Sequence, residues 1–221
     1  MTSKLKVGVL VSGSGSNLQA LIDSCAAPDH PAEIVTVISN RPGVKALERA
    51  RNAGIEAVTI DHKTFADRTG FDAEMQRALD AAGVEFVCLA GFMRLLTTEF
   101  VEHWSGRMIN IHPSLLPAFK GLNVQQRAID AGARFSGCTV HFVTPEMDVG
   151  PIIQQAAVPI LQGDSAESLA ARILEQEHRI YPGSLRWIAE GRVKIEGERV
   201  LLDGATAPSA SLLNPAPDAE R

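Results

Sequence analysis

The first two thirds of the chain alternate short apolar runs with longer segments in which apolar residues recur every three or four positions. Short apolar runs are typical of strands buried on both faces of a sheet, and the wider spacing is typical of helices with one buried face. We therefore expect strands at residues 7–11, 34–38, 57–60, 86–90 and 108–111, and helices at residues 16–26, 44–53, 71–82 and 98–104. This alternation predicts an α/β fold, a doubly wound, mainly parallel sheet with a Rossmann-like N-terminal half.

The pattern changes after Gly121. A helix is expected near residues 124–131, and it is followed by two strands that should lie close together, at residues 138–143 and 152–158. Farther on, a hairpin-like pair of strands around a glycine is expected at residues 193–195 and 199–202.

A long helix separates these two pairs of strands. It should begin near Asp164, because Asp164 and Glu167 have the spacing of a capping box. Pro182 should end or kink it, since proline cannot donate the helical hydrogen bond. From residue 204 the chain is rich in Ala, Pro and Ser. We therefore expect a single domain over residues 1–203 and a poorly ordered tail over residues 204–221.

Length and charge narrow the class of protein. At 221 residues the chain is large enough for one substantial core. Its net charge of −5 and its pI near 5.7 give no support for nucleic-acid binding. The N-terminal apolar run ends at Ser12, too early to span a bilayer, and no signal-peptide cleavage pattern follows. We expect a cytoplasmic protein that acts on small molecules, without nucleic-acid or membrane partners; monomer and homodimer both remain open.

The cysteines and histidines do not point to a metal. Cys25, Cys88 and Cys138 are odd in number and widely spaced, so they indicate neither a zinc site nor a disulfide framework. Cys88 lies in an apolar run and is expected to be a small core residue. The six histidines lack a metal-ligand spacing such as HExxH. No metal is expected.

Residues 110–117, Asn-Ile-His-Pro-Ser-Leu-Leu-Pro, carry the most informative chemistry. Residues i and i+2 of a strand point the same way, so Asn110 and His112 should present their polar groups to one spot where Pro113 ends the strand. The carboxyl ends of strands in open α/β sheets are where ligands bind. An amide beside an imidazole suits stabilisation of a developing oxyanion. The alternative is that Asn110 caps a loop and that His112 is a buried histidine bonded to the backbone.

A glycine-rich loop, Ser-Gly-Ser-Gly-Ser-Asn-Leu at residues 12–18, joins the first strand to the first helix. Glycines let backbone amides gather around an anion at a helix N-terminus, although many such turns carry glycine for steric reasons alone. Leu18 replaces the third glycine of the dinucleotide fingerprint, and the second strand ends in Ser-Asn-Arg without an acidic residue for a ribose diol. The loop therefore favours a monophosphate over NAD.

Asp148 lies in an irregular loop between two expected strands. Met147 and Val149 on either side of it hint at partial burial, and a Gly-Pro pair at residues 150–151 fixes how the loop re-enters the sheet. Spacing alone does not exclude the alternative that Asp148 is an ordinary Asx-turn carboxylate.

With these pieces together, the chain resembles the folate-dependent phosphoribosylglycinamide formyltransferase family. The resemblance covers the chain from the first strand to about residue 202. It rests on Ser-Gly-x-Gly-Ser-Asn-Leu at 12–18, Leu-Ala-Gly-Phe-Met-Arg at 89–94, Asn-x-His-Pro-Ser-Leu-Leu-Pro at 110–117, His-Phe-Val at 141–143 and Asp-x-Gly-Pro at 148–151. The third of these motifs is highly specific to enzymes that use 10-formyltetrahydrofolate, and the glycine loop selects the glycinamide ribonucleotide branch.

The resemblance implies transfer of a formyl group from 10-formyltetrahydrofolate to the glycinamide amine of 5-phosphoribosylglycinamide in de novo purine biosynthesis. It places Asn110, His112 and Asp148 at the catalytic positions. The implied ribonucleotide-binding residues are Gly15, Ser16, Asn17 and Glu177. The implied folate-binding residues are Arg68, Met93, Arg94, Leu95, Leu96, Asn110, Thr144, Pro145, Glu146, Met147 and Asp148.

Glu177 also stands out by its spacing. It falls in the apolar series Leu169, Ile173, Glu177, Ile180 of the long helix, so its carboxylate should lie on the buried face and need a partner, either an internal Arg or substrate hydroxyls. One stretch departs from many members of the family: Asn123 and Gln125 stand where histidines are often found. Local substrate contacts there stay open.

The implied reaction needs no covalent enzyme intermediate, so Ser114 is expected to be structural. Asn110 and a protonated His112 can donate to the negative oxygen of the tetrahedral intermediate, and the Asp148 carboxylate favours the imidazolium. Methionyl-tRNA formyltransferase is a weaker alternative, because it needs a further C-terminal domain and a basic surface. Formyltetrahydrofolate deformylase normally has a further N-terminal domain, whereas the first strand begins here near Leu5. A non-catalytic nucleotide-binding module would leave Asn110, His112 and Asp148 without a use.

Overall fold

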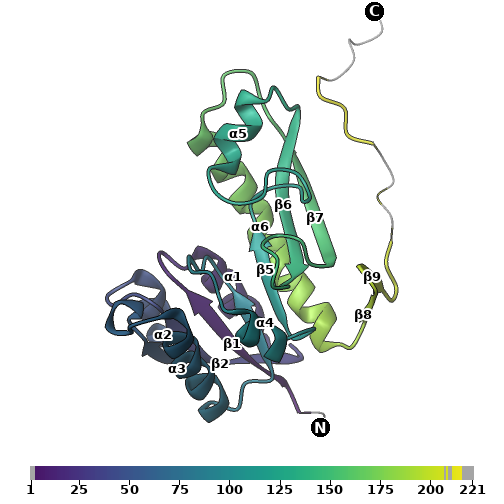
Figure 1. Cartoon of the computed structure of the whole chain (residues 1–221). Helices are drawn as coiled ribbons and strands as arrows, with labels where there is room; N and C mark the ends of the chain where they lie inside the picture. The colour runs from purple at the N-terminus through teal and green to yellow at the C-terminus, as the bar shows by residue number, and fades with distance from the viewer. Residues whose placement is uncertain (1–2, 207, 209–210, 216–221) are drawn as a thin grey trace, which may run out of the picture.

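The computed structural model describes residues 3–206, 208 and 211–215. A seven-stranded sheet runs through its centre in the order β3-β2-β1-β4-β5-β6-β7 (Figure 1). The strands are β1 Leu5–Val11, β2 Ala32–Ser39, β3 Glu56–Thr59, β4 Phe86–Leu89, β5 Met108–His112, β6 Phe135–Phe142 and β7 Ile152–Pro159. The helices are α1 Ser16–Cys25, α2 Lys45–Asn52, α3 Arg68–Ala81, α4 Thr98–His103, α5 Val124–Asp130 and α6 Ala166–Ala189, with a short 3₁₀ turn, η1, at His62–Thr64.

The sheet is parallel from β3 to β5 and antiparallel from β5 to β7. Chain order runs outward from β1 in one direction to β3, and resumes on the other side of β1 with β4. The predicted doubly wound, mainly parallel sheet is therefore confirmed, with its topological switch point between β1 and β4.

Helices pack on both faces of this sheet. Consecutive residues of a strand point to opposite faces, so they belong to different cores. In β1, Val9 packs into a core with α1, α2 and α6, whereas Leu10 packs into a second core with α3 and α4. Alternation along a buried parallel strand thus supplies apolar side chains to both layers. Cys88 is fully buried in the first core, as expected.

The long helix α6 begins near the predicted position, but its capping residues differ from the prediction and it continues past Pro182. Its N-cap is Ser165, which forms a capping box with Ser168, so the predicted pairing of Asp164 with Glu167 is wrong. Asp164 is used elsewhere: its carboxylate binds the Arg172 guanidinium with contacts of 2.8 and 2.9 Å. A charge-assisted, two-point contact outweighs a single capping bond.

Pro182 does not end α6, which continues to Ala189. A proline inside a helix costs about 3 kcal/mol, because it loses one hydrogen bond and crowds the preceding turn. Tyr181 and Leu185, on either side of it, are fully buried. The Tyr181 hydroxyl also donates to the carbonyl of Leu89 at 3.0 Å, so the helix is tied to β4 next to the proline. This packing offsets the cost.

The end of the chain matches the sequence pattern as far as it is described. The predicted hairpin forms a separate two-stranded sheet of β8 Val193–Glu196 and β9 Arg199–Leu202. Residues 204–206, 208 and 211–215 of the predicted tail have no helix or strand, and the remaining tail residues lie outside the described ones. Among the described residues, no helix combines the length and the apolar character needed to cross a membrane.

Candidate active site

Three strand ends meet at the carboxyl edge of the parallel strands, where the topology switches. The glycine loop follows β1, residues 90–97 follow β4, and β5 ends at His112. A depression of about 250 Å³ opens between the first two of these segments. It is lined by the glycine loop, Arg41, Ala90, Gly91 and Met93. This is the place where open α/β sheets bind ligands.

The glycine loop enters α1 with Gly15 at the N-cap in the left-handed conformation, φ 70°. A Cβ on Gly15 would lie 2.7 Å from the Cβ of Ala46 on α2, so the glycine is needed for close packing as well as for its φ. Leu18, the residue that departs from the dinucleotide fingerprint, is fully buried in the core. The loop therefore packs against α2 on one side and lines the depression on the other.

A buried hydroxyl joins the glycine loop to the segment after β4. Ser12 donates to the amide oxygen of Asn40 at 2.6 Å and accepts the backbone N–H of Met93 at 2.7 Å. Both Ser12 and Asn40 are almost fully buried. The Asn40 amide also contacts His62 of η1 at 3.2 Å. The ends of β1, β2 and β4 are thus fixed relative to one another.

Glu177 lies on the buried face of α6, as its spacing predicts, with 6% of its surface exposed. Its protein partner is not an Arg: the Asn17 amide donates to its Oε2 at 2.6 Å. Burial raises the pKa of the Glu177 carboxyl. The Oδ1 atom of Asn17 is buried and has no partner in the part of the chain that the structure describes. This pair therefore offers an acceptor to a ligand donor.

The structure brings the three predicted catalytic residues together through a fourth, His141. Its position in β6 lies opposite Asn110 of β5 in the antiparallel register. The Asn110 Nδ2 lies 3.3 Å from His141 Nε2, and Asp148 Oδ1 lies 4.0 Å from the same nitrogen and 3.5 Å from His112 Nδ1. His141 belongs to the His-Phe-Val motif at residues 141–143, from which no role for it was predicted. Its signal is the cross-strand pairing, which a single sequence does not contain.

The hydrogen bonds assign distinct forms to the two imidazoles. His141 Nδ1 faces the Phe142 carbonyl at 2.9 Å, so this nitrogen carries the proton and Nε2 accepts from Asn110. Burial lowers the pKa of His141, which favours this neutral form. In contrast, both nitrogens of His112 face acceptors: Nε2 contacts the Phe119 carbonyl at 3.1 Å and Nδ1 faces Asp148. His112 thus has an oxygen acceptor on each side of its ring, whereas His141 has one acceptor and one donor.

Asp148 connects the separate segments of the site. Its Oδ2 accepts the backbone N–H of Gly121 at 2.9 Å, while its Oδ1 faces the two histidines. Its backbone is in the left-handed region, φ 57°, which is uncommon for a residue other than glycine but tolerated by Asp and Asn. The carboxylate is therefore aimed by an unusual loop conformation rather than by a strand.

The predicted folate-side residues form two exposed segments beside this group. Met93 is 67% and Leu95 57% exposed, and Met147 on the other segment is 52% exposed. Such side chains are free to cover an apolar ligand surface. Arg94 and Leu96 of the predicted set belong to the first segment, and Thr144, Pro145, Glu146 and Asp148 belong to the second.

Arg68 lies away from both segments, at the start of α3. The structure links it to the first one through a buried carboxylate. Asp72 on the same helix accepts the backbone N–H of Thr97 at 2.6 Å, and Arg68 and Arg94 both act electrostatically on Asp72. Burial nevertheless raises the pKa of Asp72.

Within the described residues, no cluster of three or more His, Cys, Asp and Glu side chains has the arrangement of a metal site. The side chains gathered at the end of β5 are an amide, a pair of imidazoles and one carboxylate. Such a set can donate to an oxyanion, hold a proton and pass it on.

Comparison with known proteins agrees with this geometry. The formyl transferase family model matches residues 5–185. The chain is 44% identical to the phosphoribosylglycinamide formyltransferase of Escherichia coli K12 over 204 residues, which is 92% of this chain and 96% of that protein. A solved structure of glycinamide ribonucleotide transformylase 1 from Symbiobacterium toebii superimposes with a TM-score of 0.89 at 50% identity, covering 91% of this chain and 95% of that one.

Longer proteins are equally similar. The chain is 51% identical over 194 residues, 88% of its length, to the trifunctional purine biosynthetic protein adenosine-3 of Gallus gallus. It spans only 19% of that protein and a similar or smaller share of its counterparts in other animals. The match therefore concerns one part of these trifunctional proteins.

Proposed function

The chain belongs to the formyl transferase family, and from this membership we propose that it transfers the formyl group of 10-formyltetrahydrofolate to the glycinamide amine of 5-phosphoribosylglycinamide, a step of purine biosynthesis. The observation that carries the proposal is the group of Asn110, His112 and Asp148 beside the depression at the switch point. Residues 1–203 act as one domain in this proposal, in the cytoplasm and on small molecules only.

The ribonucleotide is assigned to the depression. Its phosphate is bound by backbone amides of Gly15, Ser16 and Asn17 at the start of α1, where the helix dipole favours an anion. Its ribose hydroxyls bind Glu177 and the free acceptor of Asn17. This places the glycinamide end of the substrate toward the end of β5.

The formyl folate is assigned to the exposed segments on the other side of the catalytic group. Met93 to Leu96 and Thr144 to Asp148 line its pterin end, while Arg68 binds its acidic tail. The apolar exposed residues of both segments lose their contact with water when the cosubstrate binds. Because Met93 lines the depression as well, the two substrates meet at this residue.

The chemistry is acyl transfer to an amine. The glycinamide nitrogen attacks the formyl carbon, and the carbonyl oxygen becomes negative in the tetrahedral intermediate. One N–H of Asn110 is held by His141, and its second N–H donates to this oxygen. His112 Nδ1 provides a further donor beside Asp148. The bond from the formyl carbon to the folate nitrogen then breaks, and the proton lost by the amine is returned to that nitrogen through His112.

Release of tetrahydrofolate, followed by its ultraviolet absorbance with and without the ribonucleotide, tests the proposal. Release that depends on the ribonucleotide is expected. Release without it would identify a deformylase, and no release under either condition would refute an enzymatic role. Because two bound substrates react as one unit, the ribonucleotide should also be required in stoichiometric amount.

A further inference from the structure

The backbone of the glycine loop is held from behind by α2. The Ala46 N–H donates to the carbonyl of Gly13 at 3.1 Å, and the Arg49 Nε donates to the carbonyl of Ser14 at 2.9 Å. In a trans peptide the C=O and the following N–H point in opposite directions. The N–H groups of Ser14 and Gly15 are therefore turned away from α2.

These two N–H groups belong to residues that line the depression at the switch point. No described residue accepts a hydrogen bond from either of them. Backbone amides that converge on a concave surface are the means by which loops bind phosphate. The orientation of the loop carbonyls toward α2 thus decides whether the amides face the ligand.

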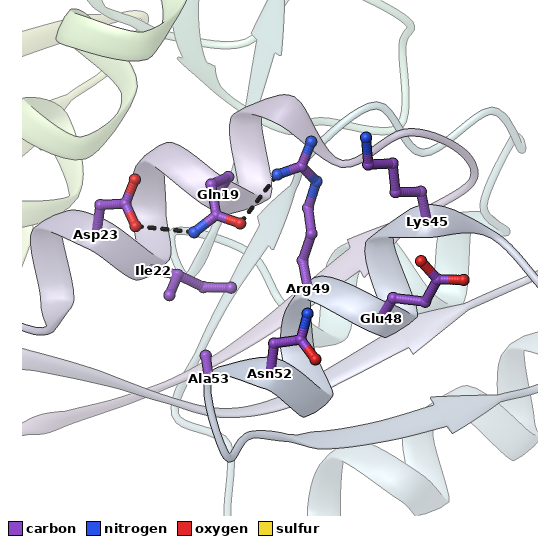
Figure 2. A pocket seen from close by; sticks show the side chains of 8 residues that line it. All are labelled: Gln19, Ile22, Asp23, Lys45, Glu48, Arg49, Asn52 and Ala53. Atoms are coloured by element: carbon purple, nitrogen blue, oxygen red, sulfur yellow. Dashed lines mark hydrogen bonds between the residues drawn. The ribbon is translucent and has the colours of Figure 1, made fainter.

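The Arg49 side chain that holds the loop is itself oriented by Gln19 (Figure 2). Its Nη1 donates to the Gln19 side-chain oxygen at 3.0 Å, and the Gln19 amide donates to Asp23 at 2.8 Å. The guanidinium is half-buried between α1 and α2, at the edge of a second depression of about 350 Å³. A chain of hydrogen bonds therefore runs from Asp23 on α1 through Gln19 and Arg49 to the loop.

We propose that Arg49 is a positioning residue for phosphate binding: it fixes the Ser14 peptide so that the Gly15 amide faces the substrate phosphate. The inference rests on the proposed function, since it assigns a role to a residue behind the ribonucleotide site. This role requires a guanidinium, which can donate from two nitrogens at once: Nε binds the loop and Nη1 binds Gln19.

The test compares Arg49→Met with Arg51→Met, which removes the same charge from an exposed position of the same helix. For Arg49→Met we expect the KM for the ribonucleotide to rise about 10-fold, the effect of losing one charged hydrogen bond. The kcat and the KM for formyl folate should stay within about twofold of the parent protein. Arg51→Met should match the parent in all three.

A second substrate separates positioning from general damage. With the dephosphorylated glycinamide riboside, which has nothing for the loop amides to bind, Arg49→Met and the parent should have equal kcat/KM. Equal losses with both substrates would overturn the inference, as would an unchanged ribonucleotide KM. An inactive parent protein would instead refute the proposed function.

Two further variants keep the test decisive if Arg49→Met does not fold. Gln19→Met leaves the cation in place but removes its orienting acceptor, so a smaller rise in the ribonucleotide KM, about 3-fold, is expected. Arg49→Lys keeps the charge but lacks the fork, and it should retain a raised KM. Full recovery in Arg49→Lys would show that charge alone suffices, and an unchanged KM in Gln19→Met would show that orientation is irrelevant; either result contradicts the proposal.

Discussion

Replacing Asp148 with Asn isolates the charge of the site from its shape. Asn has nearly the same size as Asp, and it is among the few residues that tolerate the left-handed backbone found here, φ 57°. Its side-chain oxygen can still accept the Gly121 N–H, which Asp148 binds at 2.9 Å. What the substitution removes is the negative charge 3.5 Å from His112 Nδ1.

The distance sets the size of the effect. Two unit charges about 4 Å apart interact by about 4 kcal/mol at an effective dielectric constant of about 20. The side chains of His112 and Asp148 are only 8% and 9% exposed, so solvent screens this pair little. If the transition state needs the imidazolium, loss of up to about 4 kcal/mol slows turnover by about 1000-fold, at about 1.4 kcal/mol per factor of ten. We expect kcat to fall by about 100- to 1000-fold, since part of the interaction is replaced by the amide dipole.

Tetrahydrofolate release under saturating substrates measures this effect. Asp130→Asn, which removes a carboxylate from the exposed surface of α5, is the matched control and should retain the parent activity. A kcat of Asp148→Asn within about threefold of the parent protein would refute the electrostatic role of Asp148. If the fall in kcat were accompanied by a large fall in Tm, the carboxylate would be shown to be structural instead.

Three further predictions concern the other parts of the site. Asn110→Ala and His112→Ala should each lower kcat by about 100- to 1000-fold. The double variant should lower kcat by much less than the product of the two single losses, because both side chains donate to one oxygen. Losses that multiply in the same assay would contradict a shared role. Since burial raises the pKa of Glu177, the native state keeps a proton that the unfolded state loses, and stability falls as pH rises through that interval. Glu177→Gln should therefore have a higher Tm than the parent protein at pH 8 and a raised ribonucleotide KM, whereas an unchanged Tm would contradict the burial penalty. Gly15→Val should lower the free energy of unfolding by about 2–4 kcal/mol, through the positive φ at this position and the contact with Ala46. Gly13→Ala is the control and should fold normally, because no atom lies within 4 Å of the added Cβ. Denaturant unfolding compares the two variants, and equal stabilities would refute the packing argument.

The order of apolar and polar residues along the chain was enough to predict most of the strands and helices. Buried parallel strands and their helices follow from apolar periodicity, and the common face of Asn110 and His112 follows from the two-residue repeat of a strand. The capping box at Asp164 was wrong because a residue later in the helix, Arg172, competes for the same carboxylate. The helix also continues past Pro182 rather than ending there, since packing against a distant strand holds it.

The remaining parts of the site depend on contacts between segments far apart in the sequence. His141 orients Asn110 only because β6 pairs with β5 in a particular antiparallel register. Arg49 reaches the glycine loop from the next helix, 35 positions along the chain. The protein partner of Glu177 is an amide from the loop itself, 160 positions away, rather than the internal Arg that was one of the two alternatives. Such pairings are fixed by tertiary structure, and one sequence does not display them.

The Ser12 hydroxyl has a single proton, which it donates to Asn40, and its oxygen accepts the backbone N–H of Met93. The loop assigned to one substrate and the segment assigned to the other are therefore coupled through one oxygen atom, which is shielded from water. We expect a displacement of Met93 to move the Ser12 oxygen and, with it, the strand end from which the glycine loop departs. By thermodynamic linkage, each ligand then changes the affinity for the other by the same factor, so the two sites form one cooperative unit.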